Sequence, residues 1–343
     1  MEMFQLSRAN DVRDAITAGA ASATAQQGAA VRFLAGGTTL LDLMKLNVER
    51  PSRVVDISRL PLDRIEALPD GGVKIGATAR NADLALHPLI REPYAVLSQA
   101  LLAGASAQLR NMATTGGNLL QRTRCVYFRD TAMPCNKREP GSGCPAIQGF
   151  NRTLAILGAS DACIATNPSD MNVALTALDA SIHIEGTHGP RGVAIDDFFL
   201  LPGTTPQREN VLDAGDLITH VTLPPLPAGT RSFYLKLRDR ASYEFALASA
   251  AVVVTLNGGR IDHVRVALGG VGTRPWHALE AEHVLRGATP DAATFRKAAD
   301  AALANAKPQS ENGFKIELAR RCIVHALTQC IQGNEVTPTT VAN

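Results

Sequence analysis

Two glycine pairs flanked by threonine restrict the backbone of the first half of the chain more than any other feature of the sequence. The first pair, Gly36–Gly37, directly follows the apolar segment Val31–Leu34, which reads as a buried strand. Glycine lets the chain turn sharply there, so that successive backbone N–H groups point into one concavity that suits an anion. The second pair, Gly116–Gly117, repeats this pattern after Thr114.

A single Gly-Gly turn is usually only a turn, but two such turns in one domain favour a dinucleotide cofactor held between them by its pyrophosphate. Neither turn matches G-x-G-x-x-G, which argues against a Rossmann domain. The candidate cofactor-binding residues are Phe33, Leu34, Ala35, Gly36, Gly37, Thr38, Thr39 and Leu40 in the first turn, and Thr114, Gly117 and Asn118 in the second.

The 343 residues are enough for about two domains, and the proline-rich segment 223–229 is the clearest linker between them. Before the linker, small α/β units are expected, with helices at 13–23, 40–46, 81–86, 94–104 and 171–178 and strands at 31–34, 54–57, 73–77 and 182–185. After it, the pattern predicts a β-hairpin, 246–256 with 261–268, and helices at 277–285 and 315–331. The second domain is therefore expected to be α+β.

Composition excludes several classes of function. The net charge of +2 and the aromatic content of 4% argue against nucleic-acid binding. No apolar run approaches the roughly 20 residues of a membrane span, and the N-terminus resembles no secretory signal. We expect folding in the cytoplasm, so that a periplasmic location would require co-export with a partner carrying a twin-arginine signal.

The segment between residues 119 and 163 has no helical or strand period and is rich in proline, glycine and arginine. It holds Cys125, Cys135 and Cys144, and Cys163 lies at its end. The absence of a C-x-x-C pair disfavours a zinc ribbon. Widely spaced thiols on an irregular loop favour a chain wrapped around a preformed object such as a [4Fe–4S] cluster, which needs four thiolates. The alternative is four scattered reduced cysteines.

Two other features have simple structural interpretations. Cys322 and Cys330 lie eight positions apart on the predicted helix 315–331, which favours burial in its core-facing stripe. Either Ser169 or Asp170 could serve as the N-cap of the helix 171–178, so that Asp170 has a simple structural interpretation as a capping residue.

Taken in order, these motifs resemble the FAD-binding medium subunits of the xanthine dehydrogenase, or molybdenum hydroxylase, family. In that family one turn reads Ala-Gly-Gly-Thr before an apolar residue, and the other reads Arg-Asn-x-Ala-Thr-x-Gly-Gly-Asn. The matching segments here are Ala35–Leu40 and Arg110–Asn118. The resemblance continues through Pro168–Asp170, Asp216–Thr219, Leu223–Pro224, Lys236, Arg240, Ala267–Val271 and Arg274–Pro275, and so covers essentially the whole chain.

The resemblance implies an α+β fold, with a two-part FAD-binding domain of the PCMH type over residues 1–223. Within that domain, residues 119–167 would form an irregular iron–sulfur insertion. A smaller α+β domain like that of CO dehydrogenase flavoproteins would follow over 230–335. Residues 33–40 and Thr114 would cradle the FAD pyrophosphate. Asp170 would bond ribityl or ribose hydroxyls, Ile218 would pack near the adenine or the flavin, and Lys236 would lie near the isoalloxazine.

The length of the insertion restricts the resemblance to a part of the family. Asn118 and Asp170 are 52 positions apart, whereas typical family members have a much shorter segment there. In this respect the chain is similar to the medium subunits of bacterial periplasmic aldehyde oxidoreductases, which bind FAD and an extra [4Fe–4S] cluster through four cysteines. Cys125, Cys135, Cys144 and Cys163 would be its ligands. The medium subunit of 4-hydroxybenzoyl-CoA reductase also has a cluster-bearing insertion, and stays an alternative.

The function that the resemblance implies is electron transfer within a molybdenum-dependent aldehyde oxidoreductase. A large partner with the molybdenum cofactor would oxidise the aldehyde, and a small partner with two [2Fe–2S] clusters would pass electrons to FAD and on to an external acceptor. No side chain of this chain is then expected to act as a catalytic acid or base. The competing hypotheses are a stand-alone flavoprotein oxidase and a metal-stapled scaffold subunit without flavin.

Overall fold

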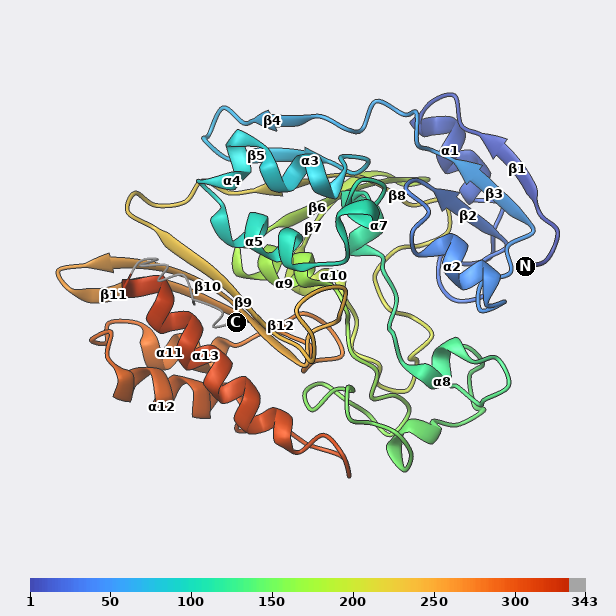
Figure 1. The fold of residues 1–343 in the computed structure, drawn as a ribbon. Helices are drawn as coiled ribbons and strands as arrows, with labels where there is room; N and C mark the ends of the chain where they lie inside the picture. The colour runs from blue at the N-terminus through green and yellow to red at the C-terminus, as the bar shows by residue number, and fades with distance from the viewer. Residues whose placement is uncertain (333–343) are drawn as a thin grey trace, which may run out of the picture.

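The N-terminal part of the computed structural model, which describes residues 1–332, is a small parallel sheet (Figure 1). Its strands lie in the order β1 (Gln5–Arg8), β3 (Arg53–Asp56) and β2 (Val31–Leu34). The connections contain α1 (Val12–Gly19) and α2 (Leu40–Lys45). The first glycine pair follows the carboxyl end of β2 and there meets the backbone at Met112, which precedes the second glycine turn.

The second sheet has five antiparallel strands in the order β4, β5, β8, β6 and β7. Their bounds are Ile65–Ala67, Val73–Gly76, Leu217–Leu223, Ser181–Gly186 and Gly189–Ala194. The helices of this part are α3 (Asn81–Leu86), α4 (Pro88–Arg91), α5 (Ala95–Ala103), α6 (Ala107–Arg110), α7 (Thr115–Leu119), α9 (Asp170–Ala177) and α10 (Ile195–Phe198). A core of buried side chains from α5, α9 and the sheet holds this layer together.

The C-terminal part is a four-stranded antiparallel sheet in the order β12, β11, β10 and β9. The strands are Trp276–His277, Arg260–Gly269, Ala248–Asn257 and Arg231–Leu237, and the helices are α11 (Leu279–Leu285), α12 (Ala292–Ala302) and α13 (Phe314–Gln332). Alternate residues of β10 face opposite sides, so that Val252 and Val254 pack on the three helices while Ala251 and Val253 join the core of the second layer. This sheet is therefore covered on both faces, as Figure 1 shows.

The cysteine-containing insertion is irregular, as predicted. Between residues 120 and 167 the only helical pieces are α8 (Val126–Arg129) and a 3-10 turn, Pro145–Ile147. Its small core is built around Phe128, Leu154 and Ile164 and also takes in Leu43 from α2. The insertion thus packs against α2 of the N-terminal part, from which it is far removed in the sequence.

The C-terminal domain holds the second half of this insertion. The side-chain nitrogen of Lys315, which is fully buried on α13, donates to the carbonyls of Thr153 at 3.1 Å and Leu154 at 2.9 Å, and also to that of Gly270. The backbone N–H groups of Asn151 and Glu311 each donate to the other residue's side chain, at 3.0 and 2.9 Å. The insertion is therefore fixed between the two larger parts of the molecule.

Most of the predicted elements are confirmed, including the hairpin of β10 and β11 and the burial of Cys322 and Cys330. The helix predicted at 13–23 is too long: it ends at Gly19, because the hydroxyl of Ser22 donates to Thr24 O and accepts from Ala30 N in a turn. The sequence did not predict α12 or the strands β1, β4, β7, β8 and β9. Residues 333–335 of the predicted second domain lie outside the described residues. Among residues 1–332, no helix has the length and apolar character that crossing a bilayer requires.

Candidate cofactor site

The two glycine turns lie directly against each other. A Cβ on Gly36 would lie 2.0 Å from the carbonyl oxygen of Met112, just before the second turn, so only glycine permits this approach. The next residue, Gly37, has φ +76°, which also favours glycine. In the second turn, Thr114 caps α7 by accepting a hydrogen bond from Gly117 N at 3.2 Å. The predicted pair of turns therefore forms one continuous surface.

The first turn offers free hydrogen-bond donors. Within residues 1–332, the backbone N–H groups of residues 36–40 donate to no acceptor, whereas those of Leu41 and Leu43 donate back to the turn. Consecutive unpaired N–H groups at the end of a strand are a site for an anion such as a phosphate. This geometry is what the sequence pattern predicts for the segment.

A cavity of about 180 Å³ opens at these donors. Its walls contain the predicted residues Phe33, Ala35, Gly36, Gly37, Thr38, Thr39, Leu40, Thr114, Gly117 and Ile218. Leu34 does not line it and packs beneath Gly37 instead. Ile218 is buried at the start of β8, so this strand supplies the apolar wall opposite the turn.

A larger cavity of about 470 Å³ adjoins the first one and shares Thr38, Thr39 and Gly117 with it. Its walls contain the remaining predicted residues Asn118, Asp170 and Lys236. Asn81 also lines this cavity, and its side-chain oxygen, although buried, has no hydrogen-bond partner in the described structure. Since buried polar atoms are rarely left unpaired, that oxygen marks a place for a ligand donor. The two cavities adjoin and together offer room for a dinucleotide.

Asp170, which lines the larger cavity, forms a buried polar cluster with Tyr234 and Lys236. Tyr234 donates its hydroxyl to one carboxylate oxygen at 2.5 Å, and Lys236 donates to the other at 2.8 Å. Burial, together with the Asp170 carboxylate, raises the pKa of Tyr234 well above its ordinary value, so the phenol stays protonated. The helix cap itself is Ser169, which accepts from Asn172 N at 3.0 Å. Asp170 is therefore not the capping residue, and each of its oxygens keeps a further lone pair.

Sequence reasoning missed Tyr234, although one signal could have revealed it. Tyr234 and Lys236 are two residues apart on β9 and so share the face of the strand that meets Asp170, while Phe233 and Leu235 pack on the helices. If residues 231–237 are recognised as a strand, this alternation of polar and apolar side chains places Tyr234 and Lys236 on the same face.

The four cysteines of the insertion line one small cavity. Cys125, Cys135 and Cys163 are buried and Cys144 is half-buried, and all are free thiols. Burial, with some contribution from the neighbouring thiols Cys135 and Cys163, raises the pKa of Cys125 to about 12. Backbone N–H groups surround the sulfurs, as where Ala165 N donates to Cys163 Sγ at 3.5 Å.

This arrangement differs from a site for one metal ion. Within residues 1–332, no three His, Cys, Asp or Glu side chains converge closely enough to bind a single ion. Four thiolates on one zinc, each about 2.3 Å from the metal, would lie within about 4 Å of one another. Thiols that surround a common cavity without meeting at one point fit a larger group, and N–H donors to sulfur are what such a group requires.

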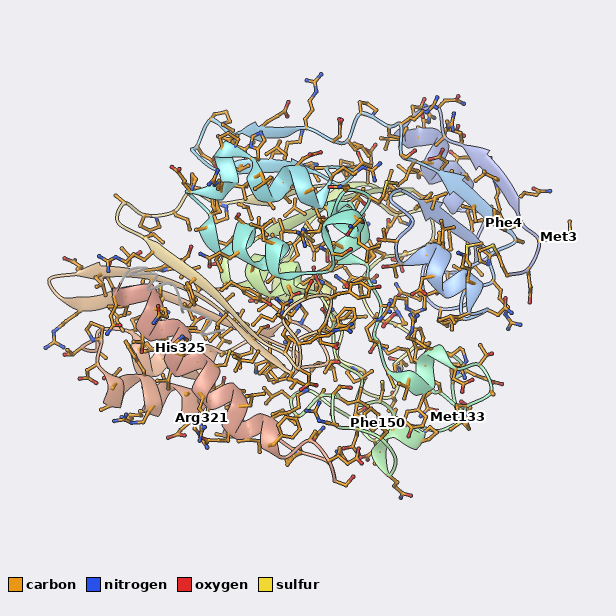
Figure 2. The ribbon with its side chains drawn as sticks, viewed as in Figure 1. Met3, Phe4, Met133, Phe150, Arg321 and His325 are labelled. Carbon is orange, nitrogen blue, oxygen red and sulfur yellow. The ribbon has the colours of Figure 1, made fainter. Side chains whose placement is uncertain are left out.

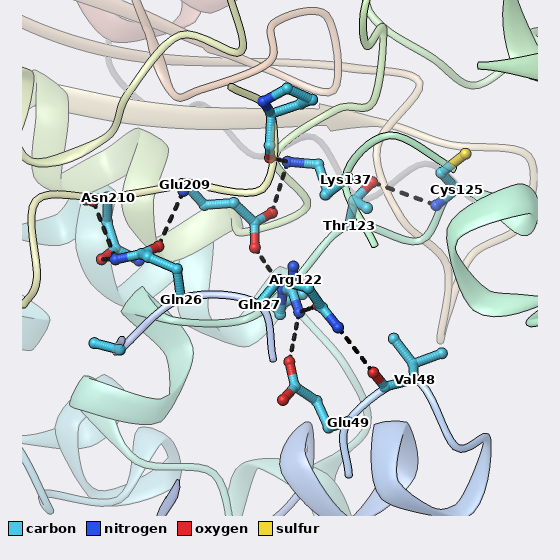
Figure 3. A network of polar contacts seen from close by, with 12 residues as sticks. Gln26, Gln27, Val48, Glu49, Arg122, Thr123, Cys125, Lys137, Glu209 and Asn210 are labelled. Atoms are coloured by element: carbon cyan, nitrogen blue, oxygen red, sulfur yellow. Dashed lines mark hydrogen bonds and ion pairs between the residues drawn. The ribbon is translucent and has the colours of Figure 1, made fainter. Parts of the chain in front are cut away.

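A buried network of charges joins the two sites (Figure 3). Arg122 donates to Glu49 at 2.5 Å and also to Glu209, while Lys137 donates to Glu209 at 2.9 Å. Arg32 of β2 donates to both oxygens of Glu49 at 2.9 Å. Burial disfavours the charged form of Glu209, but its two cationic partners outweigh this and lower its pKa to about 2. Sequence analysis did not predict this network.

Comparisons with known proteins agree with this architecture. The family described as "FAD binding domain in molybdopterin dehydrogenase" matches residues 2–226, and "CO dehydrogenase flavoprotein C-terminal domain" matches residues 233–332. The solved carbon monoxide dehydrogenase from Hydrogenophaga pseudoflava that lacks the Mo-pyranopterin moiety has a chain 26% identical to this one, with a TM-score of 0.75 and coverage of 96% of this chain and 98% of that chain. The predicted fold class is thereby confirmed.

Two relatives in sequence are informative. Over 331 residues the chain is 49% identical to "Aldehyde oxidoreductase FAD-binding subunit PaoB" of Escherichia coli (strain K12), covering 96% of this chain and 98% of that protein. It is 31% identical over 251 residues to "Glyceraldehyde dehydrogenase medium chain" of Sulfolobus acidocaldarius, covering 73% and 72%. Both names describe one subunit of a larger oxidoreductase.

Proposed function

The chain belongs to the FAD-binding medium subunits of the molybdenum hydroxylase family, and from this premise we propose that it is the flavin-carrying, electron-transferring subunit of an aldehyde oxidoreductase. The observation that carries the proposal is the pair of adjoining cavities built by the two glycine turns. Similarity to the Escherichia coli aldehyde oxidoreductase subunit over nearly the whole chain supports the substrate class.

The residues present fit FAD. The unpaired N–H groups of residues 36–40 suit its pyrophosphate, and the apolar wall at Ile218 and the polar end at Asp170 suit its two halves. FAD supplies the chemistry of taking up two electrons and passing them on. Lys236 places a cation at the larger cavity, which favours a reduced and negatively charged flavin ring.

We further propose that Cys125, Cys135, Cys144 and Cys163 hold a [4Fe–4S] cluster. The common cavity, the burial of the thiols and the N–H donors near the sulfurs support this assignment. Burial raises the pKa of the Cys163 thiol, and the nearby charge of Lys137 opposes that rise in part. The same cation would offset part of the negative charge of four thiolates.

The partners proposed are a large subunit with the molybdenum cofactor and a small subunit with two [2Fe–2S] clusters, which together deliver electrons that leave through an external acceptor. The insertion carries the exposed apolar side chains of Val126, Met133 and Phe150, two of which are labelled in Figure 2, and such a surface favours protein contact. The aldehyde itself would be oxidised on the large subunit. Assembly in the cytoplasm, with any export carried by a partner's signal, accords with this scheme.

The first test is the anaerobic UV–visible spectrum of the purified chain, with flavin and iron quantified. Flavin bands with a broad iron–sulfur shoulder and about four irons per chain are expected. A folded chain without flavin would overturn the proposal, and reduction of the flavin by aldehyde in the isolated chain would favour a stand-alone oxidase instead.

The cluster ligands need a variant of their own. Cys135→Ser is expected to lose the iron and retain flavin-binding capacity, whereas Cys330→Ala, which removes a buried thiol of α13 far from the insertion, should keep the iron. Full iron content in Cys135→Ser would contradict the ligand assignment.

A further inference from the structure

Arg122 stands on the shortest covalent path between the two proposed sites. It follows the second glycine turn, which ends in α7 at Leu119, and precedes Cys125, the first of the four cysteines. Its side chain lines the cavity at the first glycine turn and also a small cavity bounded by Lys137 and Cys163. A movement of the Arg122 side chain would therefore change the walls of both cavities.

The contacts of Arg122 are arranged asymmetrically around its guanidinium. Its Nε donates to Glu209, and its Nη1 donates to Glu49 at 2.5 Å and to Gln27. The guanidinium also lies over the ring of Phe128, 4.6 Å from the centroid, inside the insertion. Its Nη2 is buried but has no partner within residues 1–332. With the side chain only 10% exposed, that pair of N–H bonds is available to a ligand and not to bulk water.

Each carboxylate beside Arg122 connects it to one site. Glu209 accepts from Lys137, which lies two residues after Cys135 and donates to Pro206 O as well. Glu49 accepts from Arg32, which stands on β2 just before the first glycine turn. Figure 3 shows Arg122 between Glu209 and Glu49, the two carboxylates that belong to these pairs.

The network also carries an unbalanced charge. Its cations are Arg32, Arg122 and Lys137, and its carboxylates are Glu49 and Glu209, so that three positive charges meet two negative ones. A buried excess charge is costly unless an anion compensates it. Anions are what both proposed sites would receive, as a pyrophosphate on one side and a thiolate-bound cluster on the other.

We propose that Arg122 couples the two sites, using its free Nη2 to hold the cofactor in the cavity at the first glycine turn and depending on the ordered cluster loop for its position. This inference rests on the proposed function. The consequence is thermodynamic: cluster binding strengthens flavin binding, and flavin binding strengthens cluster retention by the same factor. Arg122 is a positioning residue for the cofactor and takes no part in electron transfer itself.

The test compares FAD dissociation constants, measured by fluorescence titration of flavin-depleted full-length chains. Arg122→Gln is expected to weaken FAD binding about tenfold or more, because a charged hydrogen bond is lost. Cys135→Ser should weaken FAD binding several-fold in the wild-type background but should have little effect in the Arg122→Gln background. Arg152→Gln, which removes a cation of the insertion paired with the exposed Asp239, should leave the FAD constant unchanged.

A second measurement covers the case in which Arg122→Gln does not fold. Iron release from the wild-type chain to a chelator should be slower with saturating FAD than without it, and Arg122→Lys, which keeps the charge but loses the planar fork, should show a smaller difference. Additive effects of the two substitutions, or iron release independent of FAD, would overturn the coupling alone. A wild-type chain that binds neither FAD nor iron would instead refute the proposed function.

Discussion

His277 ties the flavin-binding half of the molecule to the C-terminal half, and its protonation should be visible in the stability of the chain. Its Nδ1 lies 2.6 Å from Asp196 of α10, and its Nε2 lies 2.7 Å from Glu282 of α11. Only the protonated ring can donate to both carboxylates at once. Burial alone would lower the pKa of His277, but these two hydrogen bonds raise it to about 9.

The sign of the effect follows from this raised pKa. Between pH 6.5, the ordinary value, and about 9, the folded chain binds the proton more tightly than the unfolded chain does. The stabilisation is therefore complete below pH 6.5 and is lost as the pH rises through about 9. At 1.36 kcal/mol for each pH unit, this interval corresponds to about 3 kcal/mol as an upper limit.

The assay is urea unfolding of the wild type and of His277→Gln between pH 6 and pH 9.5. Trp276, the single tryptophan, is the neighbouring residue and provides the fluorescence signal. The wild type should be more stable than the variant at the acidic end, and the gap should close as the pH approaches 9.5. His188→Gln, at an exposed position, serves as the control. Parallel pH profiles for wild type and His277→Gln would refute the reasoning.

Three further substitutions test other parts of the structure. Lys315→Met should destabilise the chain by about 1–3 kcal/mol and lower its iron content, since buried carbonyls lose their donor. Lys307→Met, at an exposed site, should do neither, as thermal unfolding with iron analysis would show. Gly36→Ala should separate the two glycine turns and abolish most flavin binding, measured as flavin content, and a flavin-replete variant would contradict the packing described. Lys236→Met should cost about 3–5 kcal/mol by leaving Asp170 without its cation, and adding Asp170→Asn should recover part of that loss; two additive losses would argue against the pairing.

The parts of the site that were predictable from sequence are those whose chemistry is local. The turn at Gly36–Gly37 needs glycine because Gly37 has a positive φ and Gly36 lies close to the carbonyl of Met112. The sequence indicates this requirement directly, since the two glycines are consecutive. The cysteines stood out because Cys125, Cys135 and Cys144 share a segment that has no other periodicity. The family resemblance then supplied the order of the domains.

The parts that could not be predicted depend on residues brought together from far apart. Arg122 and Glu209 are 87 positions apart, and nothing in either neighbourhood indicates their pairing. Strand β9 was not predicted because both of its faces are partly buried. Tyr234 and Lys236 belong to a polar cluster on one face, so the sequence of the strand does not alternate simply between apolar and polar residues. Tertiary contacts, and not the local sequence pattern, determine the structure of such segments.

The contacts by which Lys315 and Glu311 fix the insertion form late in the synthesis of the chain. Leu154 precedes its buried partner Lys315 by 161 positions, so at about 5–20 residues per second the ribosome needs roughly 8–30 s to complete the contact. During that interval the four thiols have been made but the segment that fixes their loop has not. We therefore expect metallation to follow release of the finished polypeptide, and nascent chains stalled before α13 to expose thiols that a maleimide label can reach.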